Sequence, residues 1–229
     1  MATQTVNWLD TISNLPIGGT LILSDVSWDE YQRLVAEIVE WNGVRVTYDQ
    51  GRLEIMSPSS EHERAKEMIA LLVHVLADET GITLESLGST TYQQEWLQRG
   101  LEPDCCFYVQ NAARIIGVAD IRREKDPPPD LAVEVDVSHA SAIKLKIYAG
   151  MGVPEIWLYD RKALRMHQLV DDQYVSTNAS LTFPILTSDI LTCFIKQGLE
   201  LGQTAALKSF RQWLSAHRAE SHEQSNSGN

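Results

Sequence analysis

Residues 129–135, Pro-Asp-Leu-Ala-Val-Glu-Val, decide the fold that we expect for this chain. The apolar run at residues 131–137 predicts a central β-strand that is covered on both faces. Alternation along the strand places Glu134 on the face opposite Val133 and Val135. A buried carboxylate at Glu134 is costly unless it pairs with a base or binds a metal ion. The strand alone leaves both alternatives open.

A second carboxylate, Asp104, follows Pro103 at the start of another predicted strand, residues 104–109. An isolated Asp in this position is typical of a turn or a strand entry. Two carboxylates from neighbouring strands are, however, what a hard cation such as Mg²⁺ needs, because Mg²⁺ prefers oxygen ligands. Asp130 competes for this role, but its place at the very start of its strand favours structural capping. The pattern therefore predicts Asp104 and Glu134 as the centre of a metal site.

The helix predicted at residues 140–150 adds Lys144 to this hypothesis. Ile143 and Ile147 mark the inward stripe of the helix, and Lys144 lies beside that stripe, one turn before Tyr148. From there its ammonium could reach the end of the sheet, where a lysine can orient a water or stabilise charge on a phosphate. An ordinary surface lysine is the alternative.

Two further candidates lie at the start of the helix predicted at residues 60–79. Ser60 and Glu63 fit the Ser-x-x-Glu pattern of a capping box, which gives Glu63 a structural role. Glu61 and His62 continue the inward-facing stripes and are expected to point towards the sheet from the first turn, where the helix dipole favours a carboxylate. They are candidate ligand, base or orienting groups, and a satisfied structural pair is the alternative.

The hydrophobic pattern of the whole chain predicts a mixed α/β fold, with a central mixed β-sheet flanked by helices. Strands are expected at residues 20–23, 44–48, 53–56, 82–87, 90–94, 104–109, 131–137, 155–159 and 164–169. Helices are expected at residues 27–40, 60–79, 111–117, 140–150, 188–196 and 204–217. We expect an N-terminal arm at 1–25, irregular up to residue 18, one domain at 26–186, a helical extension at 187–217 and a disordered tail at 218–229.

The amino-acid composition restricts the binding partners and the cellular compartment that we expect for the protein. The net charge of −12 counts against a nucleic-acid-binding protein, because phosphate contacts usually require a basic face. A local basic strip could still exist, at Arg122, Arg123 and Lys125 or at Arg161, Lys162 and Arg165. No apolar run approaches the roughly 20 residues of a membrane span, and no signal peptide is evident. The three cysteines match neither a disulfide framework nor a metal site, which indicates a reducing cytoplasm.

Several short motifs occur in a fixed order along the chain. They are Gly51-Arg52-Leu53-Glu54-Ile55-Met56-Ser57-Pro58 with His62 after it, Glu102-Pro103-Asp104, residues 129–135, Lys144-x-x-x-Tyr148-Ala149, and Gly152-Val153-Pro154-Glu155-Ile156-Trp157. In this order, over roughly residues 26–170, the sequence resembles the Uma-type restriction endonuclease family, which is widespread in bacteria and expanded in cyanobacteria. That family is similar to the PD-(D/E)XK nuclease superfamily, so the resemblance implies a restriction-endonuclease-like core.

The resemblance also implies roles for individual residues. Asp104 would be the aspartate of the PD motif and Glu134 the acid of the second motif, and both would bind Mg²⁺ or Mn²⁺ together with the carbonyl of Val135. The superfamily lysine normally lies two residues after that acid, but Asp136 occupies this position. Lys144 matches the lysine of this family and would take its place. Glu61 would correspond to the acid on the first core helix of the superfamily, although His62 is the better motif match.

The activity implied by the resemblance is metal-dependent hydrolysis of phosphodiester bonds in nucleic acid, with DNA favoured over RNA. A homodimer is a candidate assembly, because many enzymes of this fold cut duplexes as pairs. Two alternatives remain. One is a non-catalytic interaction module with a nuclease fold, supported by the acidic charge, the displaced lysine and the lack of a DNA-reading element. The other is a hydrolase of a different phosphodiester, such as RNA or a small nucleotide.

Overall fold

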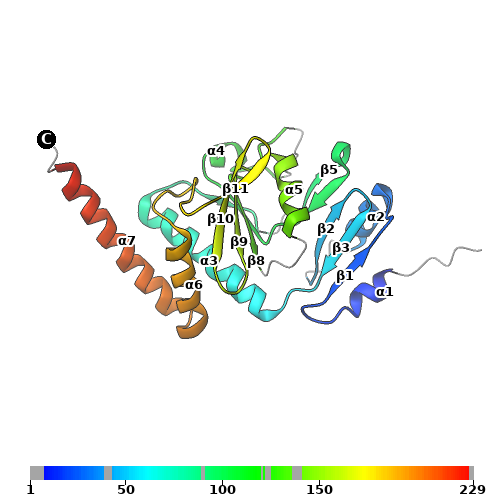
Figure 1. Cartoon of the computed structure of the whole chain (residues 1–229), viewed down its shortest axis with the longest axis horizontal. Coiled ribbons are helices and arrows are strands. Elements are labelled where there is room, and N and C mark those ends of the chain that lie inside the picture. The colour runs from blue at the N-terminus through cyan, green and yellow to red at the C-terminus, as the bar shows by residue number, and fades with distance from the viewer. Residues whose placement is uncertain are drawn as a thin grey trace, which may run out of the picture.

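The computed structural model of the chain describes residues 8–38, 43–88, 91–119, 121, 125–135 and 141–226. In this part of the chain two β-sheets are packed with helices (Figure 1). The first sheet contains, in spatial order, β1 (Thr20–Leu23), β3 (Arg52–Met56), β2 (Arg45–Asp49), β6 (Arg99–Leu101) and β5 (Tyr92–Gln94). The second contains β11 (Gln173–Thr177), β10 (Leu164–Val170), β9 (Glu155–Tyr159), β8 (Leu131–Val135), β7 (Cys105–Tyr108) and β4 (Glu85–Ser86).

The pairing of the strands confirms the expected mixed α/β fold. Every pair in the first sheet is antiparallel, and in the second sheet β8 and β9 are parallel while the other pairs are antiparallel. The expectation of one central sheet was incomplete, because the strands before residue 102, with the exception of β4, form a sheet of their own. No helix in the described ranges is long and apolar enough to cross a membrane.

The first sheet is covered by α2 (Trp28–Ile38) and the short α1 (Trp8–Ser13). Ser27 caps α2 as expected: its backbone N–H and hydroxyl both donate to Glu30 Oε2, at 2.8 and 2.6 Å. The irregular arm predicted at the N-terminus is wrong for residues 8–13, since they form α1, whose Ile12 is buried in the core with α2. The apolar residues of α1 are too few for a periodic pattern to reveal the helix.

The second sheet is covered on both faces, as the apolar strand β8 predicts. One face carries α3 (Ser60–Thr80), α6 (Ser188–Leu201) and α7 (Gln203–Asn226), and the other carries α5 (Ser141–Met151) (Figure 1). Leu131, Val133 and Val135 belong to the core beneath α3, α6 and α7, and Ala132 belongs to the core beneath α5. Glu134 shares the parity of Ala132, so the predicted alternation is confirmed.

Helix α5 lies between the two sheets (Figure 1). It packs on the second sheet through Ile147 and Met151, and it also contacts β2 and β6 of the first sheet. A Cβ added to Gly150 of α5 would lie 3.0 Å from the guanidinium of Arg99 on β6, which shows how closely the two parts approach. Residues of both sheets can therefore meet around this helix.

Some elements differ from the sequence-based expectations. Three short elements were not predicted: the strands β6 and β11 and the 3₁₀ turn η1 (Glu95–Leu97). The strand predicted at residues 82–87 is shorter than expected and is reduced to β4. The short helix predicted after residue 111 is present as α4 (Ala112–Ile115). The tail was expected to be disordered from residue 218, but its described part, residues 218–226, is helical and belongs to α7. That segment is polar but rich in good helix formers such as Ala, Glu and Gln. Residues 136–137 of the predicted strand and 39–40 of the predicted helix lie outside the described residues.

One buried carboxylate, Glu155 at the start of β9, holds the loop before α6 against the second sheet. It is 0% exposed and accepts four hydrogen bonds. Its Oε1 accepts from Trp157 Nε1 at 2.8 Å and from the backbone N–H of Leu181 at 3.1 Å. Its Oε2 accepts from the hydroxyl of Ser180 at 3.1 Å and from the backbone N–H of Thr182 at 2.7 Å. The Glu and Trp of the motif at residues 152–157 thus have a structural role.

Replacing Glu155 with Gln should destabilise the protein without touching the buried carboxylates of the neighbouring strands. The amide NH₂ would face two donors that now share a carboxylate oxygen, so we expect the free energy of unfolding to fall by about 2–4 kcal/mol. Urea denaturation would measure this change, with Glu200→Gln on the exposed surface of α6 as the control. Equal stability of the two variants would contradict the structural role of Glu155.

Candidate active site

Asp104 and Glu134 lie side by side at one end of the second sheet. Asp104 directly precedes β7, which pairs antiparallel with β8 so that Cys105 lies opposite Val133. Asp104 Oδ2 also accepts a hydrogen bond from the backbone N–H of Val135 at 2.8 Å. Both carboxylates are only 2% exposed. The two residues that the sequence pattern places in one site are thus neighbours in the structure.

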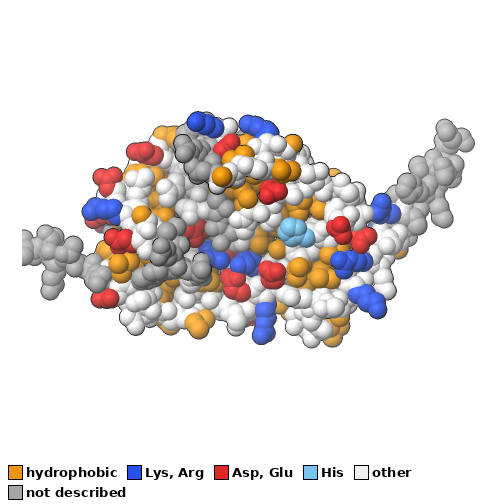
Figure 2. Space-filling view, turned by 180° about the vertical axis from the view of Figure 1, so that it is seen from behind, with side chains coloured by type: hydrophobic (Ala, Val, Ile, Leu, Met, Phe, Trp, Pro, Cys, Tyr) orange, Lys and Arg blue, Asp and Glu red, His pale blue; other side chains and the backbone are white. Residues whose placement is uncertain are grey.

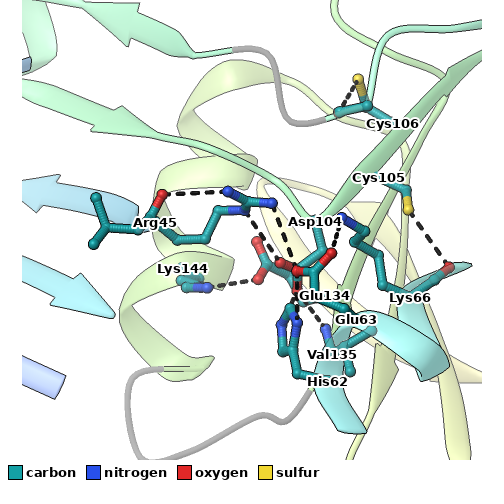
Figure 3. A network of polar contacts seen from close by, with 12 residues as sticks. Arg45, His62, Glu63, Lys66, Asp104, Cys105, Cys106, Glu134, Val135 and Lys144 are labelled. Carbon is teal, nitrogen blue, oxygen red and sulfur yellow. Dashed lines mark hydrogen bonds and ion pairs between the residues drawn. The ribbon is translucent and has the colours of Figure 1, made fainter. Parts of the chain in front are cut away.

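The carboxylate of Glu134 is held by two residues of α5. Figure 3 shows one of them, Lys144, beside Glu134. Lys144 Nζ lies 2.5 Å from Oε2, and the hydroxyl of Tyr148 donates to Oε1 at 2.5 Å. Burial, with the nearby charge of Asp104, raises the pKa of Glu134 although Lys144 opposes this. Burial alone would lower the pKa of Lys144, but the charges of Glu134 and Asp104 outweigh it and raise that pKa. Lys144 therefore reaches the end of the sheet, as expected.

Asp104 is held by a histidine from the other side of the sheet. His62 Nε2 lies 3.1 Å from Asp104 Oδ2, and the imidazole is 2% exposed. Burial alone would raise the pKa of Asp104, but the hydrogen bond from His62 and the charge of Lys144 lower it below its usual value. Burial would lower the pKa of His62, yet the hydrogen bond to Asp104 and its charge raise it. The expectation that His62 points towards the sheet is confirmed.

The roles expected for Glu61 and Glu63 are interchanged: Glu63, and not Glu61, lies beside the buried carboxylates. The N-cap of α3 is Ser59, whose hydroxyl accepts from the backbone N–H of His62, so the predicted capping box at Ser60 is wrong by one residue. Glu63 consequently has no capping role and lies beside the cluster, with Oε1 3.3 Å from His62 Nδ1. The side chain of Glu61 is 61% exposed and lies 3.5 Å from Arg161, outside the cluster. One residue turns a helix by roughly 100°, which explains the exchange.

Sequence reasoning missed three residues of this cluster: Arg45 on β2, Lys66 on α3 and Tyr148 on α5. Tyr148 carried a signal, because it lies four residues after Lys144 and so shares its helix face. Lys66 lies one turn after His62 and 2.5 Å from Glu63 Oε2. Arg45 carried no local signal, since it comes from the first sheet and reaches Asp104 only through the tertiary fold (Figure 3).

The remaining charged candidates lie outside this cluster. Asp130 has the expected structural role, because its Oδ2 accepts from the backbone N–H groups of Val109 and Asn111 at 2.7 and 3.0 Å. In the β9–β10 turn, Arg161 lies 3.5 Å from Glu61, and Arg165 on β10 pairs with Asp160 of that turn. Arg122 and Arg123 of the other basic strip lie outside the described residues. On the face drawn in Figure 2, acidic and basic side chains are interspersed, and no large basic area covers its described part.

The donor chemistry of the buried pair fits a hard divalent cation. Mg²⁺ is commonly held by one or two carboxylates together with water and substrate phosphates. Asp104 and Glu134 supply two carboxylates, but both oxygens of Glu134 already accept hydrogen bonds, so a cation would compete with Lys144 or Tyr148. In the described ranges, no group of three or more His, Cys, Asp or Glu side chains is arranged to hold a metal ion. Any metal bound here would thus depend on water or substrate for its other ligands.

Comparison with known proteins gives three findings. No curated protein matches the chain. A solved structure from Anabaena variabilis ATCC 29413, described as a "putative nuclease belonging to DUF820", matches with 15% identity and a TM-score of 0.44 over 66% of this chain and 90% of that one. The Uma2 family model, described as "Putative restriction endonuclease", matches residues 28–194, which is well over half of the chain. The chain therefore belongs to the Uma2 family of restriction-endonuclease-like proteins.

Proposed function

We propose that this protein is a Mg²⁺- or Mn²⁺-dependent endonuclease that hydrolyses phosphodiester bonds of nucleic acid at Asp104 and Glu134. One observation carries the proposal: two carboxylates, each 2% exposed, lie together at a strand end with the ammonium of Lys144 2.5 Å from Glu134. Membership of the Uma2 family supports a nuclease. Carboxylates with an adjacent lysine are a set of groups that phosphodiester hydrolysis can use.

The proposed roles follow from the chemistry of each side chain. Asp104, Glu134 and the carbonyl of Val135 would hold the cation. When bound, such a cation lowers the pKa of a water and neutralises charge on the scissile phosphate. The water oxygen would form a bond to phosphorus and give up a proton, and the bond from phosphorus to the leaving oxygen would break as that oxygen takes up a proton. The positive charge of Lys144 would stabilise the negative charge that gathers on the phosphate oxygens in this step.

Two other residues would orient the carboxylates. The hydroxyl of Tyr148 donates to Glu134 Oε1, and His62 contacts Asp104 Oδ2. Groups held in place by packing and hydrogen bonds keep the geometry that catalysis requires. His62 itself lies 3.3 Å from Glu63, so its ring is held on both sides. Glu61 has no direct contact with Asp104 or Glu134, and we therefore leave it out of the proposed catalytic set.

The proposal also covers the substrate of the protein, its oligomeric state and its location in the cell. DNA is our preferred substrate over RNA, and a homodimer would allow both strands of a duplex to be cut. We place the protein in a reducing cytoplasm because its three cysteines match no disulfide framework. The interspersed charges in Figure 2 still allow RNA or a small nucleotide as the phosphodiester.

A specific observation favours the alternative of a non-catalytic module. Both oxygens of Glu134 are engaged by Lys144 and Tyr148, and Asp104 is engaged by His62. A charge that already has internal partners needs no metal ion to stay buried. The two functions differ in one measurable property, because only the nuclease requires a divalent cation at the carboxylates.

Calorimetric titration with Mn²⁺ would separate these functions. The wild type should bind the ion, and Asp104→Asn or Glu134→Gln should each abolish detectable binding, because each variant removes an anionic oxygen ligand. Glu61→Gln is the matched control and should bind as the wild type does. If the wild type fails to bind Mn²⁺ even with a non-cleavable oligonucleotide present, the non-catalytic module is the better account.

Lys144→Met tests the lysine separately from the metal site. Loss of its charge should lower the rate of DNA cleavage roughly 10²- to 10³-fold, the usual effect of removing one group that stabilises transition-state charge. Mn²⁺ binding should persist, because both carboxylates remain. Lys146→Met, two residues away on the exposed side of α5, is the control and should cleave at the wild-type rate. Equal rates for the two variants would remove Lys144 from the mechanism.

A further inference from the structure

Arg45 extends from β2 of the first sheet into the Asp104 cluster (Figure 3). Its side chain is 13% exposed. The Nε lies 3.8 Å from Asp104 Oδ1, and the Nη2 lies 3.7 Å from Glu63 Oε1. Both distances exceed those of hydrogen bonds. The one hydrogen bond of this guanidinium among the described residues runs from Nη1 to the carbonyl of Val44 at 3.2 Å, and Nε is buried without a hydrogen-bond partner.

A second arginine of the same sheet shows what a structural pair looks like here. Arg99, on the neighbouring strand β6, places its Nε 2.8 Å from Asp49 Oδ1, and both side chains are 19% exposed. The sheet can therefore form a close arginine–carboxylate pair where the pair serves packing alone. Because buried donors are rarely left unsatisfied in folded proteins, the unused donors of Arg45 indicate a partner outside the described part of the chain.

The solvent exposure of the basic side chains, compared with that of the carboxylates, indicates that this partner is an anion. Asp104 and Glu134 are 2% exposed, whereas the side chains of Arg45, Lys144 and Lys66 are 13%, 17% and 18% exposed. The cations therefore lie between the buried carboxylates and solvent. Lys144 and Lys66 already contact carboxylate oxygens at 2.5 Å. Arg45 is thus the cation of this group with donors to spare for an incoming anion.

We propose that Arg45 is a phosphate-binding residue, whose guanidinium donates to non-bridging oxygens of the phosphodiester held at Asp104 and Glu134. A guanidinium presents its N–H groups in a planar fork that matches two phosphate oxygens, which an ammonium cannot do. This assignment rests on the proposed nuclease function and extends it, since it gives an acidic protein a local site for an anion. It also gives the first sheet a part in substrate binding.

The test measures binding of a fluorescent, mixed-sequence DNA duplex by anisotropy, with Ca²⁺ in place of Mg²⁺ and over a range of salt concentrations. Arg45→Met should weaken binding roughly 10- to 100-fold, as expected for a lost charged hydrogen-bond donor. The slope of log affinity against log salt should become shallower by about 0.9, because one phosphate contact is lost. Arg45→Lys should keep the slope but bind more weakly than the wild type. Arg99→Lys is the matched control and should bind as the wild type does.

Thermal unfolding of every variant separates folding defects from binding defects, and Arg45→Lys preserves the charge if Arg45→Met proves unstable. The assignment is overturned if Arg45→Met leaves affinity and salt slope unchanged, if Arg45→Lys and Arg99→Lys weaken binding equally, or if the wild type does not bind the duplex. Failure of the proposed nuclease function has a different result: duplex binding that depends on Arg45, but no cleavage with Mg²⁺ or Mn²⁺.

Discussion

Two carboxylates buried side by side are the constraint on which the centre of this structure depends. Asp104 and Glu134 repel each other, and neither has water to solvate its charge. Hydrogen-bond donors from three elements contact the two carboxylates. His62 comes from α3, Lys144 and Tyr148 come from α5, and a backbone N–H comes from β8 itself. The cost of burying two carboxylates together is the reason for our proposal that the pair serves chemistry rather than stability.

The position of α5 between the two sheets makes this arrangement possible. Its Ile147 and Met151 pack on the second sheet, while its other side contacts β2 and β6. The first sheet, whose strands were expected to belong to one central sheet, thereby brings Arg45 to Asp104. The proposed site is thus shared between the two sheets, with the carboxylates supplied by one and a cation supplied by the other. Each sheet needs the other for a complete set of charges.

The outcome at individual residues shows which features a sequence can predict. The alternation around Glu134 and the helix face of Lys144 follow from local periodicity, and both were confirmed. Glu61 and Glu63 were interchanged because the cap lies at Ser59, and a shift of one residue decides which side chain faces the sheet. Arg45 could not be predicted, because its contact with Asp104 depends on how two sheets pack. Asp136, at the position where the resemblance to the nuclease superfamily would place a lysine, lies outside the described residues.

The central claim is that Asp104 and Glu134 bind a divalent cation in preference to their internal partners. Anomalous diffraction from crystals soaked with Mn²⁺ and a non-cleavable DNA oligonucleotide tests it most directly. The account predicts an anomalous peak between the two carboxylates, with Lys144 or Tyr148 displaced from Glu134. Crystals without a peak at these carboxylates, with the Lys144 and Tyr148 contacts intact, would contradict it and favour a non-catalytic module.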